Sequence, residues 1–145
     1  MSCSAAAMIS ALWLAAAPAG PAPAASPPVV VATEPLFADI ARRASALKGE
    51  VEGFKGVTAP IPDAFKTRVG ELAELDMQGH RSLAERKLDG DLKCILRGIA
   101  EDLPLKLKAL DEAKTVKDRD TAVADMGYLL NDNVEVITAP PQAPV

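Results

Sequence analysis

Large apolar residues recur at spacings of three and four residues along four segments of the chain. The central segment runs from Asp91 to about Ala113, and its apolar stripe consists of Leu92, Ile95, Leu96, Ile99, Leu103 and Leu110. This period is typical of an α-helix that buries one face. Asp91 is a suitable N-cap, because its side chain can accept a backbone N–H of the first turn. Pro104 removes one hydrogen bond, so we expect a kinked helix, with a break at Pro104 as the alternative.

The first helix has the most regular stripe of the four. It is expected to begin near Thr33, with Pro35 in the opening turn, and to end at Gly53 or Gly56, because proline favours the start and glycine the end of a helix. The apolar positions that should face the core are Leu36, Phe37, Ile40, Ala44, Leu47, Val51 and Phe54.

The second helix is expected to start at Asp63 and to reach about Leu88. Gly79 and His80 form a weak point, where this helix should bend or divide because glycine lowers helix stability. Its inner face is predicted to contain Phe65, Val69, Leu72, Leu75 and Leu83.

The last helix is expected to open at Thr115, with Asp118 three residues later in a box-like cap arrangement. The polar run 131–133 is expected to close it, and residues 134–137 could then form a short extended piece. The stripe of this helix is predicted to contain Val116, Val123, Met126 and Leu130.

Short connections make consecutive helices antiparallel neighbours. The sequence therefore predicts an all-α protein, an antiparallel up-down-up-down four-helix bundle with a kinked third helix and disordered termini. Hydrophobic residues make up 49% of the chain and aromatic residues only 3%, so the core must consist mainly of Leu, Ile, Val and Ala. A length of 145 residues fits one such domain.

The stretch before Glu34 contains no charged side chain, and residues 5–17 are a short apolar run followed by Pro, Gly and Ala. This pattern is typical of a secretory signal peptide with a cleavage site at residues 22–24, although no Lys or Arg precedes the apolar run. A disordered Ala/Pro arm is the alternative. We expect a periplasmic or secreted protein without a membrane span in the mature chain. Its predicted parts are a signal peptide 1–24, a flexible arm 25–33, a helical bundle 34–137 and a loose tail 138–145.

Few residues in the sequence suggest a chemical function. His80 is the only histidine, which excludes multi-histidine zinc and di-iron sites. A haem between His80 and Met126 or Met77 is an alternative that a four-helix bundle permits, but a lone histidine is more often a surface or capping residue. We therefore predict no cofactor and no metal. The net charge of −4 and the absence of a basic patch argue against nucleic acid as a partner.

The stretch from Lys114 to Arg119 resembles, over a few residues, a segment of the small secreted all-helical chorismate mutases. The resemblance implies a dianionic substrate that is bound by basic side chains projecting from helices. Candidate residues for this role are Arg81, Arg86, Arg97, Lys114 and Arg119. Their alternative role is in ion pairs on helix surfaces.

Protein–protein contact is the function that the sequence favours, as an adaptor, an inhibitor or an envelope accessory protein. Cys94, Gly98 and Leu105 fall on the side of the central helix away from its stripe, and we predict that they form a contact face for an unidentified protein partner. Cys3 would leave with the signal peptide, so Cys94 would be the one remaining cysteine. In an oxidising compartment it could join two copies of the chain in a homodimer; a buried thiol and ordinary surface residues are the alternatives.

Overall fold

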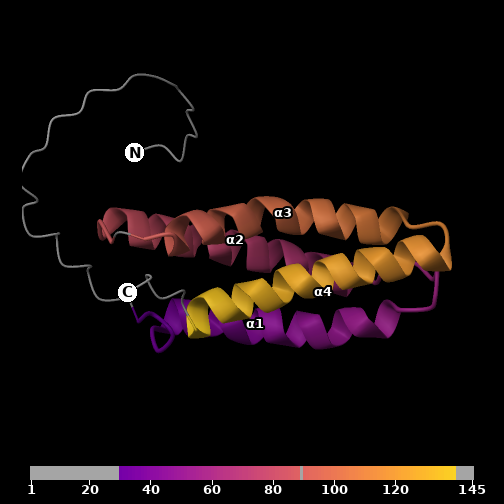
Figure 1. The fold of residues 1–145 in the computed structure, drawn as a ribbon, viewed down its shortest axis with the longest axis horizontal. Helices are drawn as coiled ribbons and strands as arrows, with labels where there is room; N and C mark the ends of the chain where they lie inside the picture. The colour runs from indigo at the N-terminus through magenta and orange to yellow at the C-terminus, as the bar shows by residue number, and fades with distance from the viewer. Residues whose placement is uncertain (1–29, 89, 140–145) are drawn as a thin grey trace, which may run out of the picture.

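The computed structural model describes residues 30–88 and 90–139, and in this part of the chain it contains four long helices and no strand. They are α1 (Pro35–Val51), α2 (Asp63–Glu85), α3 (Leu92–Glu112) and α4 (Val116–Thr138), with a single 3-10 turn, η1 (Glu52–Phe54), after α1. Figure 1 shows them as one elongated antiparallel bundle. The predicted up-down-up-down four-helix bundle is confirmed.

The helices form two pairs that pack against each other. α2 packs most extensively on α3, and α1 on α4, while the contact between α1 and α2 is the sparsest of the four neighbouring pairs. The backbones of the diagonal pairs, α1 with α3 and α2 with α4, do not approach each other closely in the described part of the chain. Each helix therefore directs one stripe toward a shared centre.

That centre is aliphatic, as the composition predicted. The described residues that are both apolar and almost fully buried come from all four stripes and include Ile40, Leu47, Leu72, Leu96, Leu103, Leu110, Met126 and Leu130. Burial of this surface is the main favourable contribution to folding. Val116 is an exception to the predicted stripe of α4, because it is 48% exposed at the start of the helix.

Pro104 lies inside α3, which continues without interruption from Leu92 to Glu112. Leu103 before the proline and Leu110 after it are both fully buried, while Pro104 itself is exposed. The apolar stripe thus keeps its phase across the proline, and the alternative of a broken helix is wrong. The predicted cap is also wrong: Asp91 has helical dihedral angles and forms no side-chain cap hydrogen bond.

The end of α4 differs from the prediction. The helix continues through the polar run 131–133 and reaches Thr138, so residues 134–137 are helical and not extended. The physical reason is that Asn133 is fully buried and Asn131 pairs with Lys48 and Glu135 on the surface. Both asparagines make a tertiary contact, Asn131 with Lys48 and Asn133 with Asp76, and so they are not limited to the local backbone hydrogen bonds that make asparagine favour helix ends. At the other end Thr115 accepts a hydrogen bond from the N–H of Asp118, as predicted.

Gly79 does not interrupt α2, which is continuous from Asp63 to Glu85. A Cβ atom at Gly79 would lie 3.1 Å from Leu96 and 3.2 Å from Phe37. The missing side chain allows α2 to pack closely against both α1 and α3. The predicted division of the helix at residues 79–80 is therefore wrong.

The predicted signal peptide and most of the predicted C-terminal tail lie outside the described residues. The predicted arm, residues 25–33, reaches the described part at residue 30, and Val31 is fully buried in the core of the bundle. No helix in the described ranges combines the length and the apolar character that crossing a membrane requires.

Candidate functional site

The predicted contact face lies on the outside of α3. Cys94 is exposed, Gly98 is half-buried with open space where a side chain would begin, and Leu105 is 63% exposed. These positions differ by about 20–40° around the helix axis at about 100° per residue, so they form one strip that points away from the core. Arg97 and Glu101, whose side chains are 2.8 Å apart, add an ion pair to the same outer surface.

A second exposed apolar side chain lies on α4, the helix that neighbours α3. Tyr128, the only tyrosine of the chain, is 70% exposed. The ion pair between Lys106 and Asp125, at 3.1 Å, shows that these two residues lie at a similar height, that is, at a similar position along the long axis of the bundle. Leu105 directly precedes Lys106, and Tyr128 lies about one turn after Asp125. Leu105 and Tyr128 therefore lie at similar heights on neighbouring helices, and we call these two residues the α3–α4 patch.

Tyr128 was not among the predicted contact residues. The signal was present, because the only tyrosine of the chain falls outside the apolar stripe of its helix. Its height next to Leu105 depends on the pairing of α3 with α4, which no local pattern specifies.

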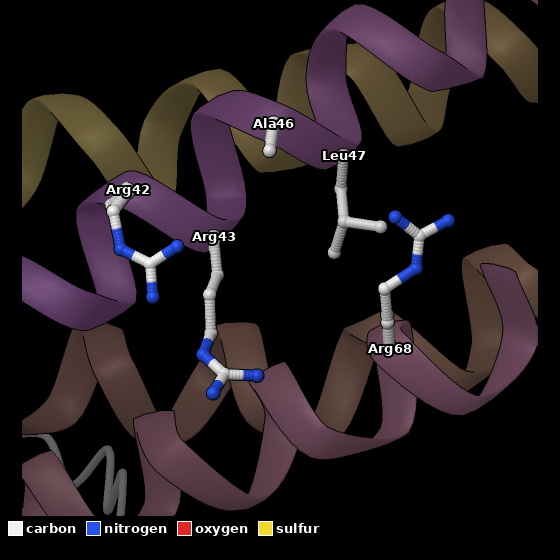
Figure 2. Close-up of a pocket in the computed structure, with 5 residues that line it drawn as sticks. All are labelled: Arg42, Arg43, Ala46, Leu47 and Arg68. Atoms are coloured by element: carbon white, nitrogen blue, oxygen red, sulfur yellow. The ribbon is translucent and has the colours of Figure 1, made fainter. Parts of the chain in front are cut away.

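An open groove of about 250 Å³ lies between α1 and α2. Arg42 and Arg43 of α1 and Arg68 of α2 form its walls, and Ala46 and Leu47 form its apolar floor. Figure 2 shows the guanidinium group of Arg43 extending toward α2 and that of Arg68 extending toward α1. The groove occurs where the contact between neighbouring helices is sparsest.

The arginines of this groove are engaged by carboxylates. Arg68 donates to both oxygens of Glu50, at 2.6 Å each, and Arg43 donates to Asp39 at 2.9 Å and to Glu71 at 3.0 Å. Arg42 also donates to Asp39, and the hydrogen bonds from Arg42 and Arg43 hold the pKa of Asp39 below its ordinary value. An anion that entered the groove would have to compete with these carboxylates.

The basic residues suggested by the chorismate-mutase resemblance do not surround one cleft. Arg86 binds Glu34 through two hydrogen bonds near the end of α2, whereas Lys114 lies in the connection between α3 and α4, at the opposite end of the bundle. Arg119, in the first turn of α4, is buried and donates to the carbonyl oxygen of Ala59 at 2.9 Å. Its role is to hold the α1–α2 loop against the bundle.

His80 has a structural contact. Its Nδ1 donates a hydrogen bond of 2.6 Å to the carbonyl oxygen of Lys93, which joins α2 to the first turn of α3. Met126, beside the Lys106–Asp125 pair, lies about 20 Å further along the bundle, at about 1.5 Å per residue of α3. Met77 is on the same helix as His80, one turn away. Neither methionine is placed to bind the opposite face of a haem held by His80.

The described residues contain no group of three or more His, Cys, Asp or Glu side chains that could hold a metal ion. Polar chemistry inside the bundle is nevertheless present, in a pair that the sequence analysis missed. Asp76 of α2 and Asn133 of α4 are both fully buried, and Nδ2 of Asn133 donates to Oδ2 of Asp76 at 2.6 Å. This bond connects a diagonal pair of helices across the centre of the bundle.

Burial raises the pKa of Asp76 to about 8, although the hydrogen bond from Asn133 acts in the opposite direction. The carboxyl group is therefore protonated at neutral pH. A weak signal for Asp76 was present in the sequence, because position 76 falls between Leu72 and Gly79 on the inner face of α2. Nothing in the sequence indicated that position 133 would supply its partner.

Comparison of the chain with protein-family models, with curated proteins and with solved structures gives no match. The resemblance to chorismate mutases thus remains limited to residues 114–119.

Proposed function

We propose that this protein is an exported helical bundle that acts by protein–protein contact, as an adaptor, an inhibitor or an envelope accessory protein, and that the α3–α4 patch is the centre of its contact surface. The observation that supports this proposal is the exposure of two large apolar side chains, Leu105 at 63% and Tyr128 at 70%, at similar heights on neighbouring helices. Tyrosine is enriched in protein interfaces, because its ring contributes apolar area and its hydroxyl remains able to hydrogen-bond.

Site-specific photo-crosslinking in the cells that produce the protein tests the contact surface. A photoreactive residue is placed at Leu105 or at Tyr128, and the control carries it at Ser45, an exposed position on α1. Both patch positions should yield the same crosslinked partner, and the control should yield none. Equal crosslinking from Ser45, or no adduct from either patch position, would contradict the proposed surface.

Export and the disulfide hypothesis are tested separately. The charge-free, apolar N-terminal stretch supports removal of residues 1–24 and delivery to the periplasm or the medium, and the exposed position of Cys94 on the outer face of α3 supports a disulfide with a second copy or a partner. Intact mass under non-reducing conditions should show cleavage and a larger species that a reducing agent splits. An unchanged size and unchanged partner binding in Cys94→Ser would remove the disulfide from the proposal, and an uncleaved chain would remove export.

One observation favours a second function, a small secreted helical enzyme acting on an anionic substrate: three guanidinium groups gather around the α1–α2 groove. Adding a small dicarboxylate to protein with labelled arginine side chains should shift the Nε signals of Arg43 and Arg68 and leave that of Arg86 in place. Unchanged signals of Arg43 and Arg68 would exclude this function for the groove.

A further inference from the structure

The buried pair of Asp76 and Asn133 lacks one hydrogen-bond donor. Asn133 donates from Nδ2 to Oδ2 of Asp76, but Oδ1 of Asp76 and Oδ1 of Asn133 have no hydrogen-bond partner within residues 30–88 and 90–139. Both atoms are oxygens, and both would be acceptors if Asp76 were ionised. Buried polar atoms without partners are costly and uncommon in proteins.

A proton on Asp76 removes this defect. A carboxylic acid and a carboxamide are complementary: the amide N–H donates to one carboxyl oxygen, and the acid O–H donates to the amide oxygen. The first of these bonds is present at 2.6 Å, and the two unpartnered oxygens are the atoms that the second would join.

We propose that the carboxyl group of Asp76 is protonated in the folded bundle and that its O–H donates a hydrogen bond from Oδ1 to Oδ1 of Asn133. Unfolding of the bundle at neutral pH then releases this proton to the solvent. The proton-linked pair fixes α2 against α4 across the diagonal. It is independent of the α3–α4 patch, since it acts in the interior. The stability of the bundle is thereby coupled to the pH around it.

Among the described residues, none that surrounds Asp76 supplies a buried charge that could replace the proton. Apart from Asn133, the inward side chains at this level of the other helices are apolar, namely Phe37, Ile40, Ala44 and Leu47 of α1, Leu96, Ile99, Ala100 and Leu103 of α3, and Met126, Leu130 and Ile137 of α4. The buried Arg119 lies in the first turn of α4, far along the helix from Asn133. On α2 the next titratable side chain toward the C-terminus is His80, one turn away, which is held by the carbonyl oxygen of Lys93.

The charged residues nearest in register on the other helices lie on partly exposed or exposed surfaces. They include Asp39 of α1 with Arg42 and Arg43, which both bind it, Lys93, Arg97, Glu101 and Asp102 of α3, and Asp132 of α4. In agreement with this arrangement, burial raises the pKa of Asp76, the hydrogen bond from Asn133 lowers it, and no neighbouring charge contributes.

The direction of the pH effect follows from proton linkage. The unfolded chain releases the Asp76 proton near the ordinary pKa of 3.8, whereas the folded chain retains it up to about pH 8. Between these values the folded state holds one more proton, so this contribution to stability is greatest at low pH, falls as the pH rises through the window, and stops changing above about pH 8.

The test compares the wild type with Asp76→Asn, which keeps the size of the side chain but cannot titrate. The ratio of the wild-type unfolding constant to that of Asp76→Asn should rise about tenfold per pH unit between pH 5 and 8 and become constant above pH 8. The matched control, Glu74→Gln, changes an exposed carboxylate on the same helix and should give a flat ratio from pH 6 to 9. A flat ratio for Asp76→Asn would overturn the proposal.

A measurement on the wild type covers the case in which Asp76→Asn does not fold. In protein labelled with ¹³C at the aspartate carboxyls, the signal of Asp76 should keep its protonated position through pH 7 and move near pH 8, and the side-chain amide signals of Asn133 should move in the same step. Titration of the Asp76 carboxyl below pH 6 would show that no shared proton joins the pair. Asn133 signals that stay unchanged while the Asp76 signal moves would show the same.

Discussion

Replacing the members of the buried pair one at a time and then together measures how strongly they depend on each other. Asp76→Leu leaves the amide of Asn133 without its partner in an apolar interior, and Asn133→Leu does the same to the carboxyl group. Because each single variant strands a fully buried polar side chain, we expect each to lose about 1–3 kcal/mol of unfolding free energy. The double variant replaces both polar groups by apolar side chains of similar size and should be close to the wild type or more stable than it.

Urea unfolding at pH 6, where Asp76 is protonated, provides the four free energies of this cycle, and unchanged slopes with denaturant show that the unfolded states remain comparable. Subtracting both single effects from the double effect gives the coupling energy, which should be at least about 1 kcal/mol in favour of the double variant. Additive losses would refute the reasoning, because they would mean that the two side chains do not share one buried contact.

Two further predictions concern the packing of the helices. Leu96→Ala should lose about 2–5 kcal/mol, since Leu96 is fully buried, whereas Leu105→Ala should stay within about 0.5 kcal/mol of the wild type because Leu105 is exposed; similar thermal midpoints for both variants would mean that the faces of α3 are assigned wrongly. Gly70→Ala should stabilise α2 by about 1 kcal/mol, since open space surrounds Gly70. The same change at Gly79 should not reproduce this gain, because the new methyl group would lie 3.1 Å from Leu96; an equal gain in urea unfolding would argue against close packing there.

The stripes of apolar residues were sufficient to predict the number of helices, their approximate bounds and their antiparallel order. The amphipathic period survives local irregularities, because burial of a whole face outweighs one poor helix former. Pro104 illustrates this, since the stripe from Leu92 to Leu110 continues across it and the helix does too. The outward positions of Cys94 and Leu105 followed from the same period, and the structure leaves both exposed.

What the sequence alone could not determine are the contacts between residues distant along the chain. Asn133 has the local character of a helix stop, and Gly79 that of a weak point, yet both are core positions whose role depends on a neighbour: Asp76 for the first, and Leu96 and Phe37 for the second. The arginine groove and the α3–α4 patch depend in the same way on which helices lie side by side and at what height. The sequence of each helix specifies which of its faces is apolar, and four such faces were enough to determine the bundle. The pairing of polar groups depends on the register between helices, which only their packing in three dimensions decided.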